Sequence, residues 1–324
     1  MRNRSWQQLI REESNFQVIM ELGAGNKRPK KETILSKTGI MTDSHSGILE
    51  QEAREKKIHV LPMPFIMNGT TYYEGVSMTR SAFYEKLREG VDVATSQPSP
   101  QDVMEMWDEM LKEYDEIVYI PISSGLSGSC MTAQALAQDE PYEGRVFVVD
   151  NGRCSTPMHQ SVLDAIRMVE AGYTAEQIRL KLEATKDQMI IYVGLSTLEY
   201  LKKGGRIKAG VATIANVLNI KPVMKFGTGT LDIYQKCRGI KNARKAMIEA
   251  MKTELETNFK KAYDAGKVHL LAASSCIAEV TEDWVKQIKE SFPGMEVRCD
   301  ELPCGLACHI GPDGLGIGCS TDPM

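Results

Sequence analysis

Long hydrophobic runs are missing from this sequence, and no apolar stretch approaches the roughly 18 residues that a membrane-spanning helix needs. The first residues also lack the uninterrupted apolar stretch of a signal peptide, because Glu12, Glu13 and Glu21 fall within them. These two absences argue against a membrane span and against secretion. We therefore expect a cytoplasmic protein.

A strong excess of charge of one sign is missing as well. The net charge of −4 gives no whole-protein field that would attract nucleic acid, so we expect no nucleic-acid partner, although local basic patches remain compatible with it. The eight cysteines are spread through the chain without the dense spacing of a small disulfide-rich domain. We expect them to be thiols, mostly buried as small hydrophobic side chains.

What the chain does contain is enough apolar sequence for two cores. At 324 residues, with 42% hydrophobic and 25% charged residues, it has an ordinary globular composition and is long for a single core. We predict an N-terminal extension over residues 1–37, a first domain over 38–187 and a second over 188–324. The extension combines a helical pattern up to about residue 23 with a linker; we favour packing of this helix on the body or on a second copy.

Short apolar strands alternate with helices between residues 38 and 187. We predict strands at 39–41, 91–94, 117–120 and 146–149, each followed by a helical pattern, with Ser99 as an N-cap before Pro100. This alternation predicts a parallel sheet covered on both faces, in which ligands bind beyond the carboxyl ends of the strands. Residues 60–75 do not fit the alternation, and we expect them to cross between the domains.

The second half of the chain follows a different pattern. Two predicted strands at 222–226 and 230–235 flank Gly227-Thr228-Gly229, which is a hairpin signal. Further strands are predicted at 189–195, 268–273, 295–301 and 314–319, with a long helix over 240–263. Hairpins mixed with helices predict an α+β domain with a mostly antiparallel or mixed sheet.

Three loops at predicted strand ends are rich in hydroxyl groups: Thr42-Asp43-Ser44, Thr95-Ser96-Gln97 and the segment from Ser123 to Ser129. We expect all three to lie on one edge of the parallel sheet, at helix N-termini, where free N–H groups and the helix dipole favour an anion. Hydroxyl groups add directional donors. A site for a carboxylate or phosphate is therefore favoured over loops that serve only as caps and turns.

The glycine-rich part of the third loop, Ser124-Gly125-Leu126-Ser127-Gly128, excludes several common sites. It lacks the Gly-Lys-Ser/Thr ending of a Walker A loop and the G-x-G-x-x-G spacing of a dinucleotide fingerprint. It is also not a G-x-S-x-G nucleophile elbow. No arrangement visible in the sequence supplies a serine with its general base, although the partners of a triad can come from anywhere in a chain.

The segment from Cys304 to Pro312 concentrates reactive side chains near the C-terminus. A zinc site is the least favoured interpretation, because Cys304, Cys308 and His309 offer three ligands at irregular spacing with Cys299 as a distant fourth. Two interpretations stay open: a turn with buried cysteines and a hydrogen-bonded histidine, or a histidine that reaches into a ligand site. We therefore expect no metal.

Taken in order over about residues 38–320, these motifs resemble the DegV family of fatty-acid-binding proteins. The matching segments are Thr42-Asp43-Ser44, Thr95-Ser96-Gln97-Pro98, Ser123-Ser124-Gly125-Leu126-Ser127-Gly128-Ser129, Leu198-Glu199-Tyr200-Leu201-Lys202-Lys203-Gly204-Gly205-Arg206-Ile207 and His309-Ile310-Gly311-Pro312. The resemblance implies a two-domain α/β protein with the ligand between its domains. It also implies a bound long-chain fatty acid, which a separate fatty acid kinase phosphorylates to an acyl phosphate, and no other cofactor.

The resemblance also implies which residues hold the ligand. The fatty acid carboxylate is expected at Thr95, Ser127 and His309. The wider ligand-binding set is Thr95, Ser96, Ser123, Ser124, Gly125, Ser127, Gly128, His309 and Gly311. Basic positions expected to face the kinase are Arg206 and Arg238. Two residues depart from the family pattern: His45, where a small hydroxyl residue is usual, and Asp313, where glycine is common.

A carrier role agrees with elementary energetics. Burying an acyl chain stabilises the complex by about 0.8 kcal/mol per methylene, so neutral donors can hold the carboxylate and leave it nucleophilic, without an arginine clamp. No set of Mg²⁺-binding carboxylates beside a phosphate loop is evident, so the kinase is expected to be another protein. We therefore interpret the chain as a carrier and not as an enzyme.

Two alternatives remain open on the sequence. The chain could be a hydrolase or phosphotransferase that acts on a small anionic substrate through Ser127 or His309. It could also be a regulatory ligand sensor whose N-terminal helix contacts a partner. The preferred acyl chain length, the oligomeric state and any transient membrane contact are not determined by the sequence.

Overall fold

Four parallel strands form the first sheet, in the order β2-β1-β6-β7. They are β1 (Thr38–Asp43), β2 (Ile58–Leu61), β6 (Glu116–Ile120) and β7 (Val146–Val148). In the computed structural model, the described residues are 36–206, 220–227 and 231–324. Three predicted features lie outside these ranges: the N-terminal helix, Ile207 of the family motif, and residues 228–230 of the hairpin. The described part belongs to one compact unit, Ser36–Met324.

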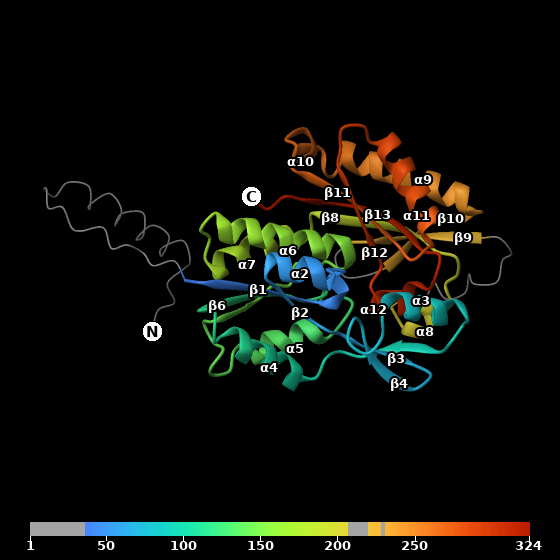
Figure 1. Cartoon of the computed structure of the whole chain (residues 1–324). Coiled ribbons are helices and arrows are strands. Elements are labelled where there is room, and N and C mark those ends of the chain that lie inside the picture. The colour runs from blue at the N-terminus through green and yellow to red at the C-terminus, as the bar shows by residue number, and fades with distance from the viewer. Residues whose placement is uncertain (1–35, 207–219, 228–230) are drawn as a thin grey trace, which may run out of the picture. The chain divides into compact units, whose positions relative to one another are not determined.

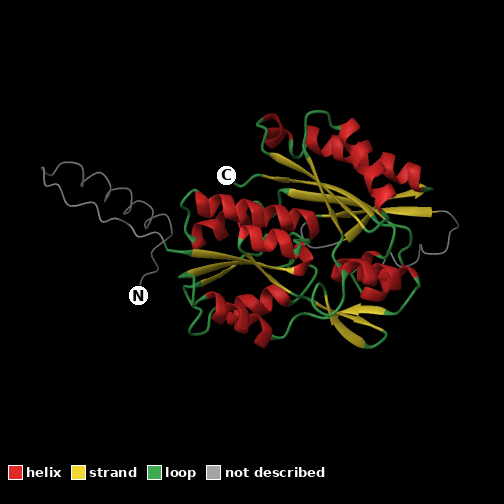
Figure 2. Cartoon of the chain, viewed as in Figure 1, coloured by secondary structure: helices red, strands yellow, loops and turns green. Residues whose placement is uncertain are grey.

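Helices cover both faces of this sheet, as predicted (Figures 1 and 2). The period of two along β6 explains why: Val118 and Ile120 pack into one core, whereas Ile117 and Tyr119 pack into another. The helices are α2 (Glu50–Lys56), α4 (Pro100–Met110), α5 (Ser129–Leu136), α6 (Ser155–Glu170) and α7 (Ala175–Ala184), with a 3-10 turn η1 (Ser44–Ser46) after β1. The predicted cap of α4 is confirmed, because the Ser99 side chain accepts the Asp102 N–H.

A small antiparallel sheet corrects one expectation from the sequence. Its strands are β3 (Pro64–Met67), β4 (Thr70–Tyr73) and β5 (Val93–Thr95), which lie in the order β4-β3-β5. Helix α3 (Arg80–Arg88) connects β4 to β5. Asn68 and Gly69 adopt positive φ and close the β3–β4 hairpin. Because β5 pairs with this hairpin, the loop after Thr95 does not lie on the edge of the parallel sheet.

The second half of the chain builds a six-stranded mixed sheet, in the order β10-β9-β8-β13-β11-β12. The strands are β8 (Met189–Gly194), β9 (Ile220–Phe226), β10 (Leu231–Arg238), β11 (Val268–Ser274), β12 (Val297–Glu301) and β13 (Leu315–Thr321). All neighbouring pairs are antiparallel except β11–β12. Met247 of α9 (Ile240–Glu256) and Trp284 of α11 (Ala278–Ser291) share a core with one face of this sheet. The predicted mixed sheet is therefore confirmed.

One helix prediction in this half was wrong. The single helix predicted over 240–263 is two helices, because the chain breaks at Thr257 before α10 (Lys260–Asp264). The side chain of Asn258 folds back onto Glu254 at this break. The segment from Cys304, for which a turn was one of two open interpretations, forms the buried helix α12 (Cys304–Ile310). Lys202 and Lys203 belong to helix α8 (Glu199–Gly204).

The inner face of the six-stranded sheet faces the first half of the chain. One core cluster contains Ile40 and Val162 from the first half together with Phe226 and Leu302 from the second. The predicted boundary near residue 187 falls between α7 and β8, so the two large sheets do not share a strand. None of the helices in the described ranges is both long and apolar enough to cross a membrane.

Candidate ligand-binding site

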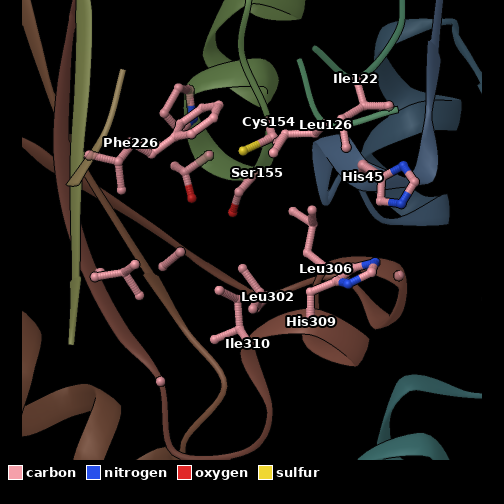
Figure 3. A pocket seen from close by; sticks show the side chains of 18 of the residues that line it. His45, Ile122, Leu126, Cys154, Ser155, Phe226, Leu302, Leu306, His309 and Ile310 are labelled. Carbon is pink, nitrogen blue, oxygen red and sulfur yellow. The ribbon is translucent and has the colours of Figure 1, made fainter. Parts of the chain in front are cut away.

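A deep pocket lies where the inner face of the six-stranded sheet meets the start of α6, helix α12 and the loops after β5 and β6 (Figure 3). Its empty volume, including the open mouth, is about 1090 Å³. Most of the lining is apolar. The large apolar side chains that line it are Ile122, Leu126, Ile191, Val193, Phe226, Leu231, Leu271, Leu302, Leu306 and Ile310.

The sheet side of the pocket is a trough that follows from strand register. Phe226, Ile191, Gly318 and Leu271 are paired in one row across four adjacent strands. The next row on the same face runs from Val193 through Gly316 to Ala273. The central strand β13 thus contributes only glycines to this face, while large side chains stand on either side of it.

Gly316 shows why the trough stays open. A methyl group added there would touch only backbone atoms of the neighbouring strands, at 3.6 Å or more, and would not overlap them. A longer side chain at this position would therefore extend into the pocket. Contacts within the protein therefore do not require glycine at this position, and the missing side chain leaves room for a ligand.

Two residues from distant parts of the chain form a polar pair at one end of the pocket. Thr95 Oγ1, at the end of β5, lies 2.9 Å from His309 Nε2 on α12. Gly204 permits this arrangement, because a methyl group at that position would overlap the His309 imidazole. The other ring nitrogen, Nδ1, is buried and has no hydrogen-bond partner among the described residues.

His309 is held in its neutral form. Burial, with smaller contributions from Arg206 and His45, lowers the pKa of His309 from its ordinary value to about 4. At neutral pH the imidazole therefore carries one N–H donor and one acceptor, with no net charge. The Thr95–His309 pair is a neutral hydrogen-bonding group at the end of an apolar trough.

His45 brings a second imidazole to the same end of the pocket (Figure 3). Its Nδ1 lies 2.9 Å from Asp43 Oδ1, and Asp43 Oδ2 accepts the N–H of Ile122. Gly305 provides the space, because a side chain there would overlap the His45 ring. The departure of His45 from the family pattern is thus a change in the lining of the site, which the sequence left open.

The serine-rich loop contributes less to the lining than its composition predicts. Ser127 lines the pocket, and its Oγ accepts the N–H of Ser129 at the start of α5. Ser123 Oγ accepts the N–H of Gly125. Ser124 Oγ instead donates to Asp150. Burial raises the pKa of this carboxyl, but hydrogen bonds from Lys186 and Ser124 outweigh it and lower the pKa below its ordinary value.

Several predicted ligand residues lie outside the lining. Gly311 has φ of 78°, and a side chain there would overlap Tyr200. The predicted ligand residues that line the pocket are Thr95, Ser96, Ser127 and His309. Those that do not line it are Ser123, Ser124, Gly125, Gly128 and Gly311.

The two predicted partner-facing arginines occupy different places. Arg206 lines the pocket, and its guanidinium donates to the carbonyl oxygens of Leu126 and Gly204. A positive charge therefore stands at the pocket, which the expected all-neutral site did not include. Arg238 is exposed at the end of β10 and does not line the pocket, and Asp313 is also exposed outside it.

The segment around Cys304 is not arranged as a metal site. Burial raises the pKa of Cys308 to about 12 and that of Cys304 above its ordinary value, so both remain thiols. Within the described part of the chain, their sulfur atoms do not converge with a His309 nitrogen. Of the interpretations left open by the sequence, the structure shows a histidine that reaches into a pocket.

One other group of potential metal ligands lies away from the pocket. Donor atoms of Asp164, His269 and Asp322 lie within 4.8 Å of one another. Arg167 already donates to the carboxylates of both Asp164 and Asp322, at 2.8 and 3.0 Å. The guanidinium thus supplies the positive charge that these carboxylates require.

Sequence reasoning missed the glycines of the trough and Ser155 at the start of α6, which lines the pocket. The glycines carried a readable signal. Gly314-Leu315-Gly316-Ile317-Gly318 alternates small and large residues at the strand period, which predicts one face without side chains. Ser155 carried no such signal, because its position depends on how the start of α6 meets the second half of the chain.

Comparisons with known proteins agree with this arrangement. Residues 37–322 match the family model described as "Uncharacterised protein, DegV family". A DegV domain-containing protein of Caldanaerobacter subterraneus is 29% identical over 287 residues, which cover 87% of this chain and 98% of the relative.

Solved structures share the fold. A DegV family protein from Thermus thermophilus, described by its fatty acid binding, has a TM-score of 0.77 and 28% identity, covering 88% of this chain and 99% of that one. A fatty acid binding DegV family protein from Streptococcus agalactiae has a TM-score of 0.76 and 25% identity, with the same coverage. The match to the family model spans most of the chain, and the chain therefore belongs to the DegV family.

Proposed function

We propose that this chain binds one long-chain fatty acid, with the acyl chain in the glycine trough and the carboxylate at the Thr95–His309 pair. The observation that carries the proposal is the combination of an apolar trough with a neutral hydrogen-bonding pair at one end. Each buried methylene stabilises the complex by about 0.8 kcal/mol, so the trough supplies most of the affinity. The fatty acid binding described for two solved relatives supports the same ligand class.

We further propose that the chain presents this carboxylate to a separate fatty acid kinase in the cytoplasm. A carboxylate oxygen attacks the terminal phosphorus of ATP, the bond to ADP breaks, and an acyl phosphate forms. A neutral His309 supports this step, because a hydrogen bond from an uncharged donor withdraws less electron density than a cation would. Arg206, beside the carboxylate, and the exposed Arg238 are the proposed contacts for the kinase.

The hydrolase alternative receives less support from the geometry. A serine nucleophile needs a base within hydrogen-bonding distance. Among the described residues, Ser127 Oγ accepts a backbone N–H, and His309 Nε2 is bonded to Thr95 and not to Ser127. The pair that the alternative requires is therefore not assembled.

Native mass spectrometry of the purified chain tests the binding step directly. We expect a mass increment that matches one long-chain fatty acid, or uptake of one palmitate per chain on titration. Addition of a fatty acid kinase and ATP should then give acyl phosphate and ADP. A chain that remains free of lipid after titration would overturn the proposal, and hydrolysis of acyl esters by the chain alone would favour the enzyme alternative.

A further inference from the structure

One hydroxyl group inside the pocket lacks a hydrogen-bond partner. Seven serine and threonine residues line the cavity: Thr95, Ser96, Ser127, Ser155, Thr156, Ser274 and Ser275. Six of their hydroxyl groups are bonded to protein atoms. Within the described ranges, Ser155 Oγ has no partner, although the residue is only 5% exposed. Figure 3 shows this side chain directed into the cavity, between Phe226 and His309 in that view.

The backbone at Ser155 is also unusual. Its φ of 53° lies in the left-handed region, which a residue other than glycine rarely adopts. Strain of this kind persists where the surrounding structure fixes it, and it clusters at ligand sites. Ser155 is therefore held in place at a conformational cost, with its hydroxyl group facing the pocket.

The same residue opens a long helix. Helix α6 has 16 residues, and its N-cap, Cys154, makes no side-chain hydrogen bond to the first turn. Cys154, Ser155, Thr156 and Pro157 all line the pocket, so the positive end of the helix dipole borders the cavity. This end of the helix and Ser155 Oγ together form a second polar position, distinct from the Thr95–His309 pair.

The chemistry of this position selects a class of ligand. A hydroxyl donor and a helix N-terminus favour an acceptor oxygen. A second anion would be costly to bury among apolar side chains, whereas a neutral oxygen that is hydrogen-bonded to Ser155 would cost much less. We propose that the preferred acyl chain carries a hydroxyl or oxo group along its length, and that Ser155 and the start of α6 receive this oxygen. The inference rests on the proposed function, since the carboxylate remains at the Thr95–His309 pair.

Positional isomers of hydroxystearic acid test this inference on the full chain, with stearic acid as the reference ligand. We expect one isomer, or two adjacent ones, to bind about fivefold more tightly than stearic acid, which corresponds to one added hydrogen bond. Isomers with the hydroxyl elsewhere should bind more weakly than stearic acid, because their oxygen would be buried without a partner. The Ser155→Ala variant should lose the preference and keep its affinity for stearic acid.

Two further variants keep the test decisive. Ser274→Ala removes a lining hydroxyl group that is already bonded to Thr281, so this variant should retain the isomer preference. Ser155→Gly removes the hydroxyl group and relieves the backbone strain, and it replaces Ser155→Ala if that variant does not fold. Binding of stearic acid without any isomer preference, or a preference that survives in Ser155→Ala, overturns this inference alone. Failure of stearic acid and every isomer to bind overturns the proposed function together with it.

Discussion

The trough and the mouth of the pocket are built in different ways. The trough comes from one sheet, where strand register places Gly316 and Gly318 between larger side chains. The mouth is the polar end of the pocket, and it is assembled from residues far apart in sequence. His45 follows β1, Thr95 ends β5 and His309 lies on α12. The trough thus depends on local alternation and supplies affinity, whereas the mouth depends on tertiary contacts and supplies orientation and chemistry.

The largest effect is expected from filling the trough. Gly316→Leu should displace roughly five methylenes of the ligand and weaken fatty acid binding by about 4 kcal/mol, or about a thousandfold. Isothermal titration with palmitate measures this loss. A leucine on the exposed surface, Ala135→Leu, is the matched control and should leave the affinity unchanged. Near-normal binding by Gly316→Leu would show that the acyl chain lies elsewhere.

The next effect concerns the mouth and its dependence on pH. The pKa of His309 is about 4 in the folded chain, because burial and nearby positive charge disfavour protonation, and about 6.5 in the unfolded chain. Between these values the unfolded chain binds the proton more readily. The neutral His309 therefore makes its full contribution to the free energy of unfolding above pH 6.5. This contribution, up to about 3 kcal/mol, is lost as the pH falls to about 4.

Urea unfolding of wild type and His309→Gln at pH 7 and at pH 4 measures this contribution. The wild type should lose about 3 kcal/mol more than the variant over this range, because glutamine does not titrate. Equal losses in the two proteins would contradict a neutral, buried imidazole at the mouth.

Removing the hydroxyl group of the mouth should have a smaller effect on binding than filling the trough. Thr95→Ala deletes the partner of His309 Nε2 and should weaken palmitate binding about tenfold, or about 1.4 kcal/mol. Acyl phosphate formation should fall further, because the carboxylate is no longer oriented. Parallel titration and kinase assays separate the two losses. A loss confined to protein stability would indicate that Thr95 is only structural.

The smallest effect is expected from the exposed charge at the mouth. Arg206→Gln removes a positive charge that lowers the pKa of His309, so this pKa should rise. Because Arg206 is exposed to solvent, its contribution to palmitate affinity should stay within a few-fold. NMR titration of the His309 ring protons detects the pKa change. A pKa that stays the same or falls would show that the guanidinium does not act on this imidazole.

The sequence predicted the trough side of the molecule better than the mouth. The apolar run at residues 117–120 and the alternation at 314–319 are local information, so both strands could be inferred from the sequence, and the glycine face of the second was readable although it was missed. The position of Thr95 could not, because β5 pairs with the β3–β4 hairpin through contacts between distant residues. The buried helix around His309 was also missed, since a seven-residue segment that contains Gly305 and is followed by Gly311 has little helical propensity of its own.

A crystal structure of the chain with bound palmitate tests the central claim most directly. We predict that one carboxylate oxygen lies within hydrogen-bonding distance of Thr95 Oγ1 or His309 Nε2. The acyl chain should cross the strand face of Gly316 and Gly318. A carboxylate at the start of α6 beside Ser155, or an acyl chain outside the trough, would contradict the account.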